Sequence, residues 1–222
     1  MAKIISIVNQ KGGVGKTTSA VNLVAALGAM GKKVLLIDID PQGNTTSGFG
    51  IDKDSVEYSI YDVLINDIPL KSAIVKTKYK NLDVCPSNIQ LSGAEIELVG
   101  IDNREFRLKE AFLSIKDEYD YIIIDCPPSL NTLTINAMTT ADSVLVPIQC
   151  EYYALEGLSQ LIHTIDLVKE RLNPDLEIEG VVFTMYDART NLSLQVVENV
   201  KDNLNQTIYK TIIPRNIRLA EA

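Results

Sequence analysis

The feature that most constrains the fold is a short apolar run that leads into a glycine-rich segment near the N-terminus. Ile4, Ile5, Ile7 and Val8 are nearly continuous apolar residues, which is typical of a strand buried on both faces of a parallel sheet. Three glycines follow at once, at positions 12, 13 and 15. Because glycine tolerates positive φ and lets the backbone approach a ligand, successive N–H groups can point at one anion. The order of strand, loop and helix therefore predicts a phosphate-binding site.

The segment after this loop is expected to form a helix that begins near Lys16. The free amides and the positive dipole end of that helix add to the phosphate site. Lys16 can reach the β- and γ-phosphates of a nucleotide, and the hydroxyl of Thr17 can hold Mg²⁺. The common pattern G-x-x-x-x-G-K-[ST] is not met, because position 10 is Gln10 and a second lysine, Lys11, stands at the head of the loop.

The run Lys11-Gly-Gly-Val-Gly-Lys16-Thr17 resembles the deviant Walker A loop of the ParA/Soj/MinD family of ATPases. The resemblance implies ATP and Mg²⁺ as cofactors and an ATP-dependent homodimer, in which Lys11 reaches the partner's nucleotide. Catalytic roles are then expected for Lys11, Lys16 and Asp40. The residues expected to bind the nucleotide phosphates are Lys11, Gly12, Gly13, Val14, Gly15, Lys16, Thr17 and Thr18.

Two carboxylates follow the next apolar run, residues 34–37. Because side chains alternate along a strand, Asp38 and Asp40 are expected on the same side, at the carboxyl edge where open α/β sheets bind ligands. By the resemblance, Asp38 holds Mg²⁺ through water and Asp40 orients the water that attacks the γ-phosphate. The alternative is an aspartate pair that caps the turn before Pro41. Residues 41–60 are rich in Gly, Asn, Thr and Ser, which favours a mobile switch loop.

A second apolar run, residues 121–125, ends in Asp125 and predicts a Walker B strand. Asp125 would hold Mg²⁺ through water, opposite Thr17; a helix N-cap is the alternative. Two later segments also resemble the Soj branch of the family, namely Cys126-Pro-Pro-Ser-Leu130 and the Glu-Tyr-Tyr-Ala-Leu-Glu-Gly run at residues 151–157.

Apolar strands and amphipathic helices alternate along the rest of the chain. Strands are expected at residues 82–85, 143–147, 178–183 and 208–213, and helices at residues 89–99, 103–116 and 191–204, with one more that ends near residue 172. This order predicts a doubly wound α/β domain with a mostly parallel sheet of about seven or eight strands, as in P-loop NTPases. Residues 1–222 are expected to form a single P-loop ATPase domain, which by the resemblance lacks a final C-terminal helical segment.

The resemblance also places the adenine base against Thr184 and Met185, and against the turn Pro214-Arg215-Asn216. Asn216 can read a base edge and Pro214 can cover its face, although an ordinary turn is the alternative.

A net charge of −8 argues against a wholly basic DNA-binding surface, so any DNA contact must be a local patch. Residues 185–222 carry five Lys and Arg against four Asp and Glu. Arg189 and Arg218 are therefore predicted to bind DNA phosphates. The alternative is that they are solvated or form ion pairs, for instance with Asp187 or Glu221.

The function that the resemblance implies is partition of chromosomes or plasmids. The ATP-bound dimer would bind DNA without sequence preference, and a ParB/Spo0J-type partner protein would stimulate slow ATP hydrolysis and release it. Apolar runs are far shorter than the roughly 18 residues of a membrane span, so a cytoplasmic protein without a membrane partner is expected. The resemblance implies that it is associated with the nucleoid.

Three other functions stay open at this point. A MinD-like division-site ATPase would need an amphipathic membrane-targeting helix. A reductase of the iron-protein type would need a cysteine pair at a subunit interface, whereas Cys85, Cys126 and Cys150 have no C-x-x-C spacing. A small-molecule synthetase would consume ATP only with an organic acid present.

Overall fold

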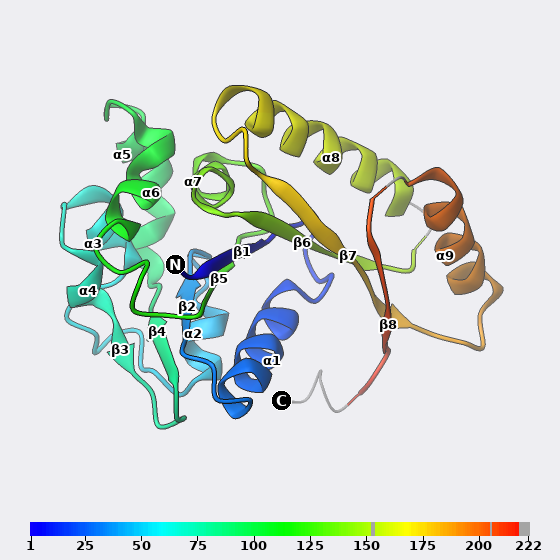
Figure 1. Ribbon diagram of the computed structural model, residues 1–222, viewed down its shortest axis with the longest axis horizontal. Helices are drawn as coiled ribbons and strands as arrows, with labels where there is room; N and C mark the ends of the chain where they lie inside the picture. Colours follow the sequence, from blue (N-terminus) through cyan, green and yellow to red (C-terminus); the bar gives the residue numbers. More distant parts are fainter. Residues whose placement is uncertain (152–153, 205, 218–222) are drawn as a thin grey trace.

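The longest apolar runs of the chain form the centre of one β-sheet. The computed structural model describes residues 1–151, 154–204 and 206–217. In these ranges an eight-stranded sheet has the order β3-β4-β2-β5-β1-β6-β7-β8 (Figure 1). The strands are Lys3–Ile7 (β1), Val34–Asp38 (β2), Val75–Lys76 (β3), Leu82–Cys85 (β4), Tyr121–Asp125 (β5), Ser143–Gln149 (β6), Glu177–Tyr186 (β7) and Ile208–Pro214 (β8). Neighbouring strands are parallel, except that β3 and β4 are antiparallel.

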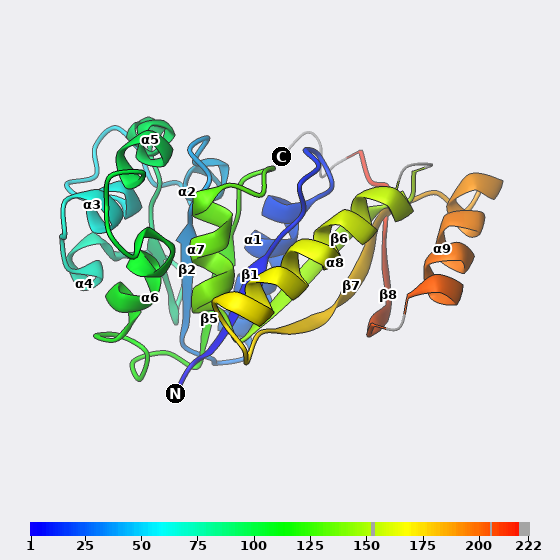
Figure 2. The ribbon, with the colours of Figure 1, turned by 90° about the horizontal axis from the view of Figure 1, so that it is seen from above.

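Helices cover both faces of the sheet. Figures 1 and 2 show α1 on one face and α7 and α8 on the other. The α-helices are Lys16–Ala29 (α1), Asn44–Gly48 (α2), Ile60–Ile65 (α3), Leu70–Ala73 (α4), Ala94–Leu98 (α5), Arg107–Phe112 (α6), Thr132–Thr140 (α7), Ala154–Arg171 (α8) and Asn191–Asn203 (α9). Two 3-10 helices precede α5 and α6, at Ile89–Gly93 (η1) and Arg104–Phe106 (η2).

Alternate residues of the central strands pack on opposite faces, which explains why these strands read as continuous apolar runs. On β2, Leu35 and Ile37 join the core under α3 to α9. Leu36, between them, joins the smaller core under α1, with Ala20 and Val24. The prediction of a doubly wound, mostly parallel sheet is therefore confirmed.

Three local expectations differ from the structure. Residues 41–60 contain the short helix α2, and the helix expected over residues 103–116 is reduced to η2 and α6. Helix α7 was not predicted, because seven of its nine residues are buried and many of them are polar. Its polar side chains bind backbone carbonyls instead of water: Asn136 Nδ2 donates to Arg104 O at 2.8 Å and Thr139 Oγ1 donates to Glu105 O. A helix without an exposed polar face shows no helical period in its sequence.

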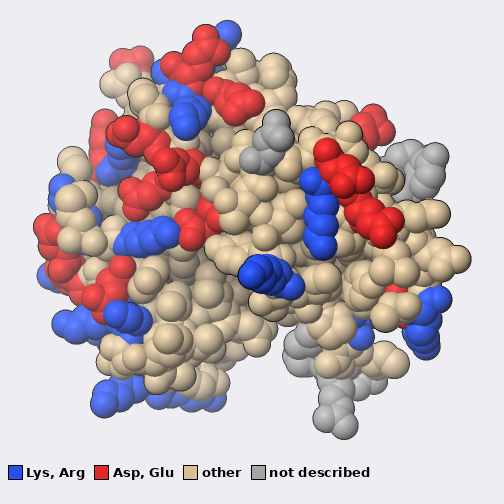
Figure 3. Space-filling model, turned by 45° about the vertical axis from the view of Figure 1, so that its right-hand side comes forward, with Lys and Arg blue, Asp and Glu red and all other residues tan. Residues whose placement is uncertain are grey.

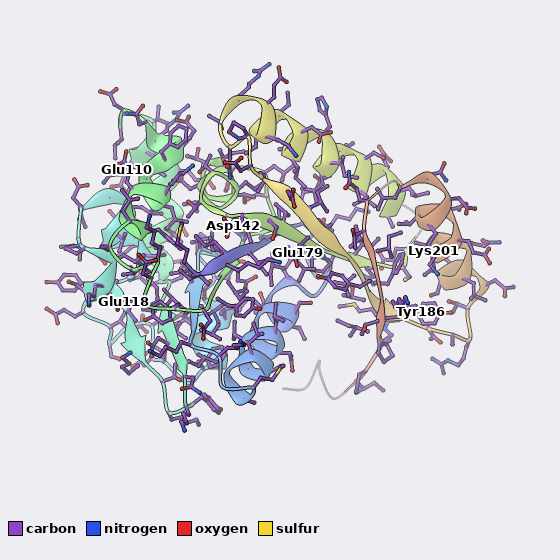
Figure 4. All side chains as sticks on the ribbon, in the orientation of Figure 1. Glu110, Glu118, Asp142, Glu179, Tyr186 and Lys201 are labelled. Carbon is purple, nitrogen blue, oxygen red and sulfur yellow. The ribbon has the colours of Figure 1, made fainter. Side chains whose placement is uncertain are left out.

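Acidic side chains join the strands at their amino ends. Asp142 Oδ2 accepts the Ile4 amide at 2.7 Å, and Glu179 binds Lys3 Nζ and Ser143 Oγ at 2.8 and 2.7 Å. Figure 4 shows Asp142 and Glu179 close to the start of β1. These contacts fix β1, β6 and β7 relative to one another, and thereby the loops at their carboxyl ends.

The face that α1 covers also carries an open apolar groove of about 580 Å³ between α1 and strands β6 to β8, lined in part by Leu23, Leu27, Val182 and Ile213. Within the described ranges, no helix combines the length and the apolar character that crossing a membrane requires.

Candidate nucleotide-binding site

The glycine-rich loop joins the carboxyl end of β1 to α1 as predicted. Gly13 and Gly15 have φ angles of 73° and 86°, a conformation that side chains disfavour. The Lys16 side chain folds back over the loop, and its Nζ donates to Lys11 O at 2.9 Å. Lys16 is only 7% exposed, and burial lowers its pKa, an effect that the charge of Asp125 partly offsets. A partly buried cation therefore stands inside the curve of the loop.

Asn9 holds the start of the loop and was not among the predicted residues. Its Oδ1 accepts the Lys11 amide at 2.9 Å, and its Nδ2 donates to Pro147 O of β6 at 2.8 Å. Asn9 thus fixes the loop to the neighbouring strand. A buried asparagine directly after an apolar strand was the available signal, because buried amides need partners.

The two predicted metal-site aspartates lie on adjacent strands. The parallel register pairs Asp38 of β2 with Asp125 of β5, and both residues are 0% exposed. Asp38 Oδ2 accepts the Thr46 amide and hydroxyl at 2.8 and 2.7 Å. Burial, followed by the nearby charge of Asp125, raises the pKa of Asp38 to about 7. The Asp38 carboxyl is therefore harder to ionise than a carboxyl in water.

Asp125 has one satisfied and one unsatisfied carboxylate oxygen. Its Oδ2 accepts the Thr17 hydroxyl at 2.8 Å and the Thr45 hydroxyl. Its Oδ1 is buried and has no hydrogen-bond partner in the described part of the chain. Burial raises the pKa of Asp125 to about 6, although the hydrogen bonds from Thr45 and Thr17 lower it.

These residues fit Mg²⁺. Mg²⁺ prefers oxygen ligands, keeps several waters and usually takes one or two protein ligands beside substrate phosphates. Thr17 Oγ1 and the unpartnered Asp125 Oδ1 supply such oxygens next to the loop. The described residues include no cluster of three or more His, Cys, Asp or Glu that could hold a metal ion.

Asp40 lies two residues beyond Asp38, at the same edge of the sheet. It is 9% exposed, and its Oδ1 accepts the Gln42 amide at 2.9 Å. This hydrogen bond is of the kind expected for an aspartate that caps a turn. It uses only the Oδ1 oxygen and holds the carboxylate in one orientation. Asp40 is therefore nearly buried, with its Oδ1 held by the Gln42 amide.

Thr45 and Thr46 are the site residues that the sequence reasoning missed. Both are 0% exposed and belong to α2, inside the segment that was predicted to be a mobile switch loop. The signal was present in their positions, since two hydroxyls seven and eight residues after the strand that ends in Asp38 are suited to bind carboxylates. The structure fixes this segment onto Asp38 and Asp125.

The residues predicted to contact adenine line a single cavity of about 220 Å³ beside the loop. Thr184 Oγ1 donates to Val14 O at 2.8 Å, which fixes the end of β7 to the loop. The Arg215 amide donates to Tyr186 O at 3.0 Å, which holds the turn after β8 against the same strand; Figure 4 labels Tyr186 there. The lining residues are Gly15, Thr18, Ser19, Thr184, Met185, Ile213, Pro214, Arg215 and Asn216.

Lys11 lies against its own chain. A Cβ atom on Gly157 of α8 would come within 3.1 Å of Lys11 Cε, so the lysine stem crosses the first turns of α8. Gln10, beside it, donates from Nε2 to Gln160 Oε1 at 2.9 Å. The start of α8, at Gly157, therefore packs beside the head of the loop; residues 152 and 153 of the predicted run lie outside the described residues.

The predicted DNA-binding arginines have different outcomes. The Arg189 side chain is 87% exposed but binds Asp187 through two contacts, Nε to Oδ1 at 2.8 Å and Nη2 to Oδ2 at 2.6 Å. The guanidinium holds the pKa of the Asp187 carboxyl well below its usual range. The ion-pair alternative for Arg189 is thus the arrangement that the structure shows. Arg218 and Glu221 lie outside the described residues.

The three cysteines are unpaired and buried, and burial raises the pKa of each thiol. Buried thiols in their protonated form match inert core residues better than cluster ligands, which bind as thiolates.

Comparison with known proteins identifies relatives of this chain. A family model described as an AAA domain matches residues 2–178. The sporulation initiation inhibitor protein Soj of Bacillus subtilis (strain 168) is 62% identical over 222 residues, covering 100% of this chain and 88% of the relative. The chromosome partitioning protein ParA of Myxococcus xanthus (strain DK1622) is 56% identical over 221 residues, covering 100% of this chain and 78% of that protein.

A solved structure with the same fold is that of cobyrinic acid a,c-diamide synthase from Mycobacterium smegmatis, with bound ATP analogue and magnesium. It superposes with a TM-score of 0.92 at 40% identity and covers 98% of this chain and 88% of that one.

Proposed function

Since this chain belongs to the ParA/Soj-type family of P-loop ATPases, we propose that it is a DNA-partitioning ATPase that dimerises when it binds ATP. The observation that supports this best is the contact between Thr17 and Asp125, whose second oxygen is buried without a described partner beside a loop with two lysines. That arrangement suits the binding of a metal–nucleotide complex.

Each residue of the site would have a separate role in phosphoryl transfer. Bound Mg²⁺ would neutralise phosphate charge, with Thr17 as a direct ligand and with Asp38 and Asp125 bound through water. Lys16 would balance the charge of the β- and γ-phosphates from inside the loop. Asp40 would orient the attacking water as an acceptor, a role that its single bond to Gln42 leaves open.

Lys11 would make hydrolysis depend on dimerisation. In a single chain its stem lies along α8 at Gly157, so a role at the nucleotide of the partner requires this side chain to turn outward. Charge neutralisation of the transition state would then be complete only in the dimer. Hydrolysis would then occur only in the assembled dimer, and its slow rate would set the lifetime of the dimer.

DNA binding and its release would follow from the same cycle. The ATP-bound dimer would bind nucleoid DNA without sequence preference, with Arg189 and Arg218 as proposed contacts. DNA phosphate must then compete with Asp187 for Arg189. A ParB/Spo0J-type partner protein would stimulate hydrolysis and release the dimer. A MinD-like membrane ATPase is the alternative within the family.

The likeness to the Mycobacterium smegmatis synthase favours a second candidate function, ATP-dependent amide synthesis on an organic acid. The two candidates differ in the need for an acid substrate. Phosphate release from ATP without any organic acid, stimulated by DNA and a ParB-type protein, would support the partitioning ATPase and exclude the synthase.

The decisive experiment measures binding of a labelled DNA duplex with ADP, with ATP and with a non-hydrolysable ATP analogue. We expect binding with ATP and with the analogue and little binding with ADP. Equal binding in all three states would contradict a cycle timed by hydrolysis.

A further inference from the structure

We propose that two turns at the amino-terminal edge of the sheet form a surface that binds the phosphate backbone of DNA. We call it the lysine surface; its members are Lys32, Lys33, Lys76, Lys78 and Lys80. The DNA identity of the ligand rests on the proposed function, whereas the position of the surface rests on the structure alone. All five side chains are exposed, and none was predicted as a DNA contact.

The two turns are fixed against each other. The first joins α1 to β2 and the second joins β3 to β4, and β2 pairs with β4 from Val34 and Leu82 onward. The Val34 amide donates to Asn81 O at 2.8 Å, and Asn81 Nδ2 reaches Gly28 O at 3.4 Å. A Cβ atom on Gly28 would lie 3.3 Å from Lys80 O, so the glycine permits this close approach. Lysines about fifty residues apart in the chain are thereby gathered on one edge.

The positive charge of this surface is largely uncompensated. Lys76 pairs with Asp83 at 2.6 Å, but the other four lysines form no ion pair with any described residue. Two of the nearby acidic side chains have cations of their own: Asp117 binds the N-terminal ammonium at 3.6 Å and Glu118 binds Lys71 at 2.8 Å. A third, Asp120, accepts the backbone amide of Lys33 and forms no ion pair with a described residue.

The space-filling view agrees with this charge distribution. Figure 3 shows blue side chains gathered along the lower left edge of the molecule, with no red side chain beside the lowest of them. In a chain with a net charge of −8, such a region is where a polyanion meets the least repulsion.

The second turn is rigid enough to present its lysines. Thr77 Oγ1 donates to Leu82 O at 2.7 Å and accepts the Tyr79 amide at 3.1 Å. Lys78 Nζ lies 5.3 Å from the centre of the Tyr79 ring, and Phe49 packs against that ring at 5.9 Å and 83°. Because Lys78 and Phe49 already contact the Tyr79 ring, the ring is better placed to hold the Lys78 ammonium group than to stack on a base.

The chemistry favours DNA over an acidic peptide. Lysine ammonium groups are point charges that bind phosphate oxygens without the forked geometry used to read bases. A polar cavity of about 580 Å³ beside the turns is lined by Lys33 and Lys76 together with Asp83, Asp117 and Glu118, and these carboxylates would repel acidic side chains that entered. A duplex lying across the rim would meet Lys32, Lys78 and Lys80, which do not line this cavity.

The position of the surface separates it from the nucleotide site. Lys33 precedes β2 and Asp38 ends it, so the lysines lie at the amino ends of the strands and the metal site at their carboxyl ends. Each chain would carry its lysine surface whether or not nucleotide is bound. In a dimer that shares its nucleotides through Lys11, the carboxyl ends of the strands would face the partner, so the two lysine surfaces would lie on opposite outer sides of the dimer. A short duplex would therefore meet one lysine surface, and the ATP dependence of DNA binding would come from contacts elsewhere on the dimer.

The test compares two double variants with the same loss of charge. Lys78→Gln/Lys80→Gln removes two members of the lysine surface, and Lys109→Gln/Lys169→Gln removes two exposed lysines on α6 and α8. Binding of a fluorescein-labelled 24-base-pair duplex is measured with the non-hydrolysable ATP analogue over a series of KCl concentrations. We expect the slope of log K against log salt to fall by about 1.8 in the first variant, because each phosphate contact contributes about 0.9. The control variant should keep the wild-type slope.

Each outcome decides one question. Equal slopes in the two variants would overturn the lysine surface, while wild-type DNA binding would leave the proposed function standing. Wild-type protein that binds no DNA in any nucleotide state would contradict the proposed function itself. Labelled poly-glutamate serves as a second probe: if the lysine-surface variant loses poly-glutamate and not DNA, the surface belongs to an acidic protein partner and the proposal is wrong.

Discussion

Replacement of Lys16 by methionine tests the phosphate site with the least structural disturbance. Methionine keeps an unbranched apolar stem, so the 7% exposed side chain can stay packed. The substitution removes the cation and its bond to Lys11 O. Because burial already lowers the pKa of Lys16, holding this charge without nucleotide is unfavourable. Loss of the charge relieves this cost and loss of the hydrogen bond to Lys11 O offsets the gain, so the stability of the nucleotide-free protein should change little.

The effect on ATP binding should be large. Lys16 is positioned for two charge-assisted hydrogen bonds, one each to the β- and γ-phosphates, and such bonds contribute about 1.5–3 kcal/mol apiece. Their loss predicts about 3–6 kcal/mol of binding free energy. That corresponds to a dissociation constant for ATP that is roughly 100 to 10,000 times higher, since 1.4 kcal/mol is a factor of ten.

The chain has no tryptophan, so binding is followed by calorimetry or by a fluorescent ATP derivative, and folding by circular dichroism. Lys109→Met, an exposed lysine on α6, is the matched control. A Lys16→Met protein that melts like the wild type and binds ATP with the same affinity would show that the phosphates lie elsewhere.

Four further predictions concern the same cycle. Asp40→Ala should keep ATP binding and lose hydrolysis, giving a dimer on DNA that persists for hours in size-exclusion chromatography with ATP; rapid turnover would assign the water to another residue. Lys11→Ala should bind ATP as a monomer without dimer formation or hydrolysis, and an active variant would favour the synthase candidate. Arg189→Glu should lose DNA affinity and also repel Asp187, whereas unchanged DNA binding in the ATP state would remove Arg189 from the contact surface. Asp125→Asn should stabilise the nucleotide-free protein in EDTA, increasingly so as the pH rises from about 4 to about 7.

The sign of the pH effect follows from the raised pKa values. In the folded chain the carboxyl groups of Asp38 and Asp125 have pKa values of about 7 and about 6, against 3.8 in the unfolded chain. Between these limits the folded state binds more protons than the unfolded state, so these groups cost stability as the pH rises. Asp125→Asn removes the charge of Asp125 and also the repulsion that this charge exerts on Asp38. A melting-temperature gain that shrinks toward pH 7 would contradict this reasoning.

Much of the site could be read from the sequence, because its residues follow apolar strands directly. Lys16, Asp38 and Asp125 each come at the end of a strand or the start of a helix, and parallel strands bring their carboxyl ends to one edge. The register between Asp38 and Asp125 then follows from pairing alone. The cavity that joins Met185 to Asn216 needed the resemblance as well, since two loops about thirty residues apart show no common pattern.

Other features depend on contacts that sequence patterns do not encode. The net charge of sequence segments does not indicate the lysine surface, because Lys33 and Lys80 lie on neighbouring turns only through the pairing of β2 with β4. Helix α7 was missed because hydrogen bonds to backbone carbonyls take the place of an exposed polar face. In both cases the sequence pattern does not show which backbone segments lie side by side.

The segment after Asp40 shows why composition alone misleads. Its Gly, Asn, Thr and Ser residues predict mobility, because they neither bury apolar surface nor favour a helix. Yet the neighbouring strands end in two buried carboxylates, and buried carboxylates need donors. Thr45 and Thr46 supply those donors through α2, so the demand for partners at Asp125 and Asp38 orders a segment whose own propensities would leave it loose. The order of this segment is therefore set by the buried carboxylates that it borders. Threonine is a weak helix former, yet the hydroxyls of Thr45 and Thr46 hold α2 in place by binding these carboxylates.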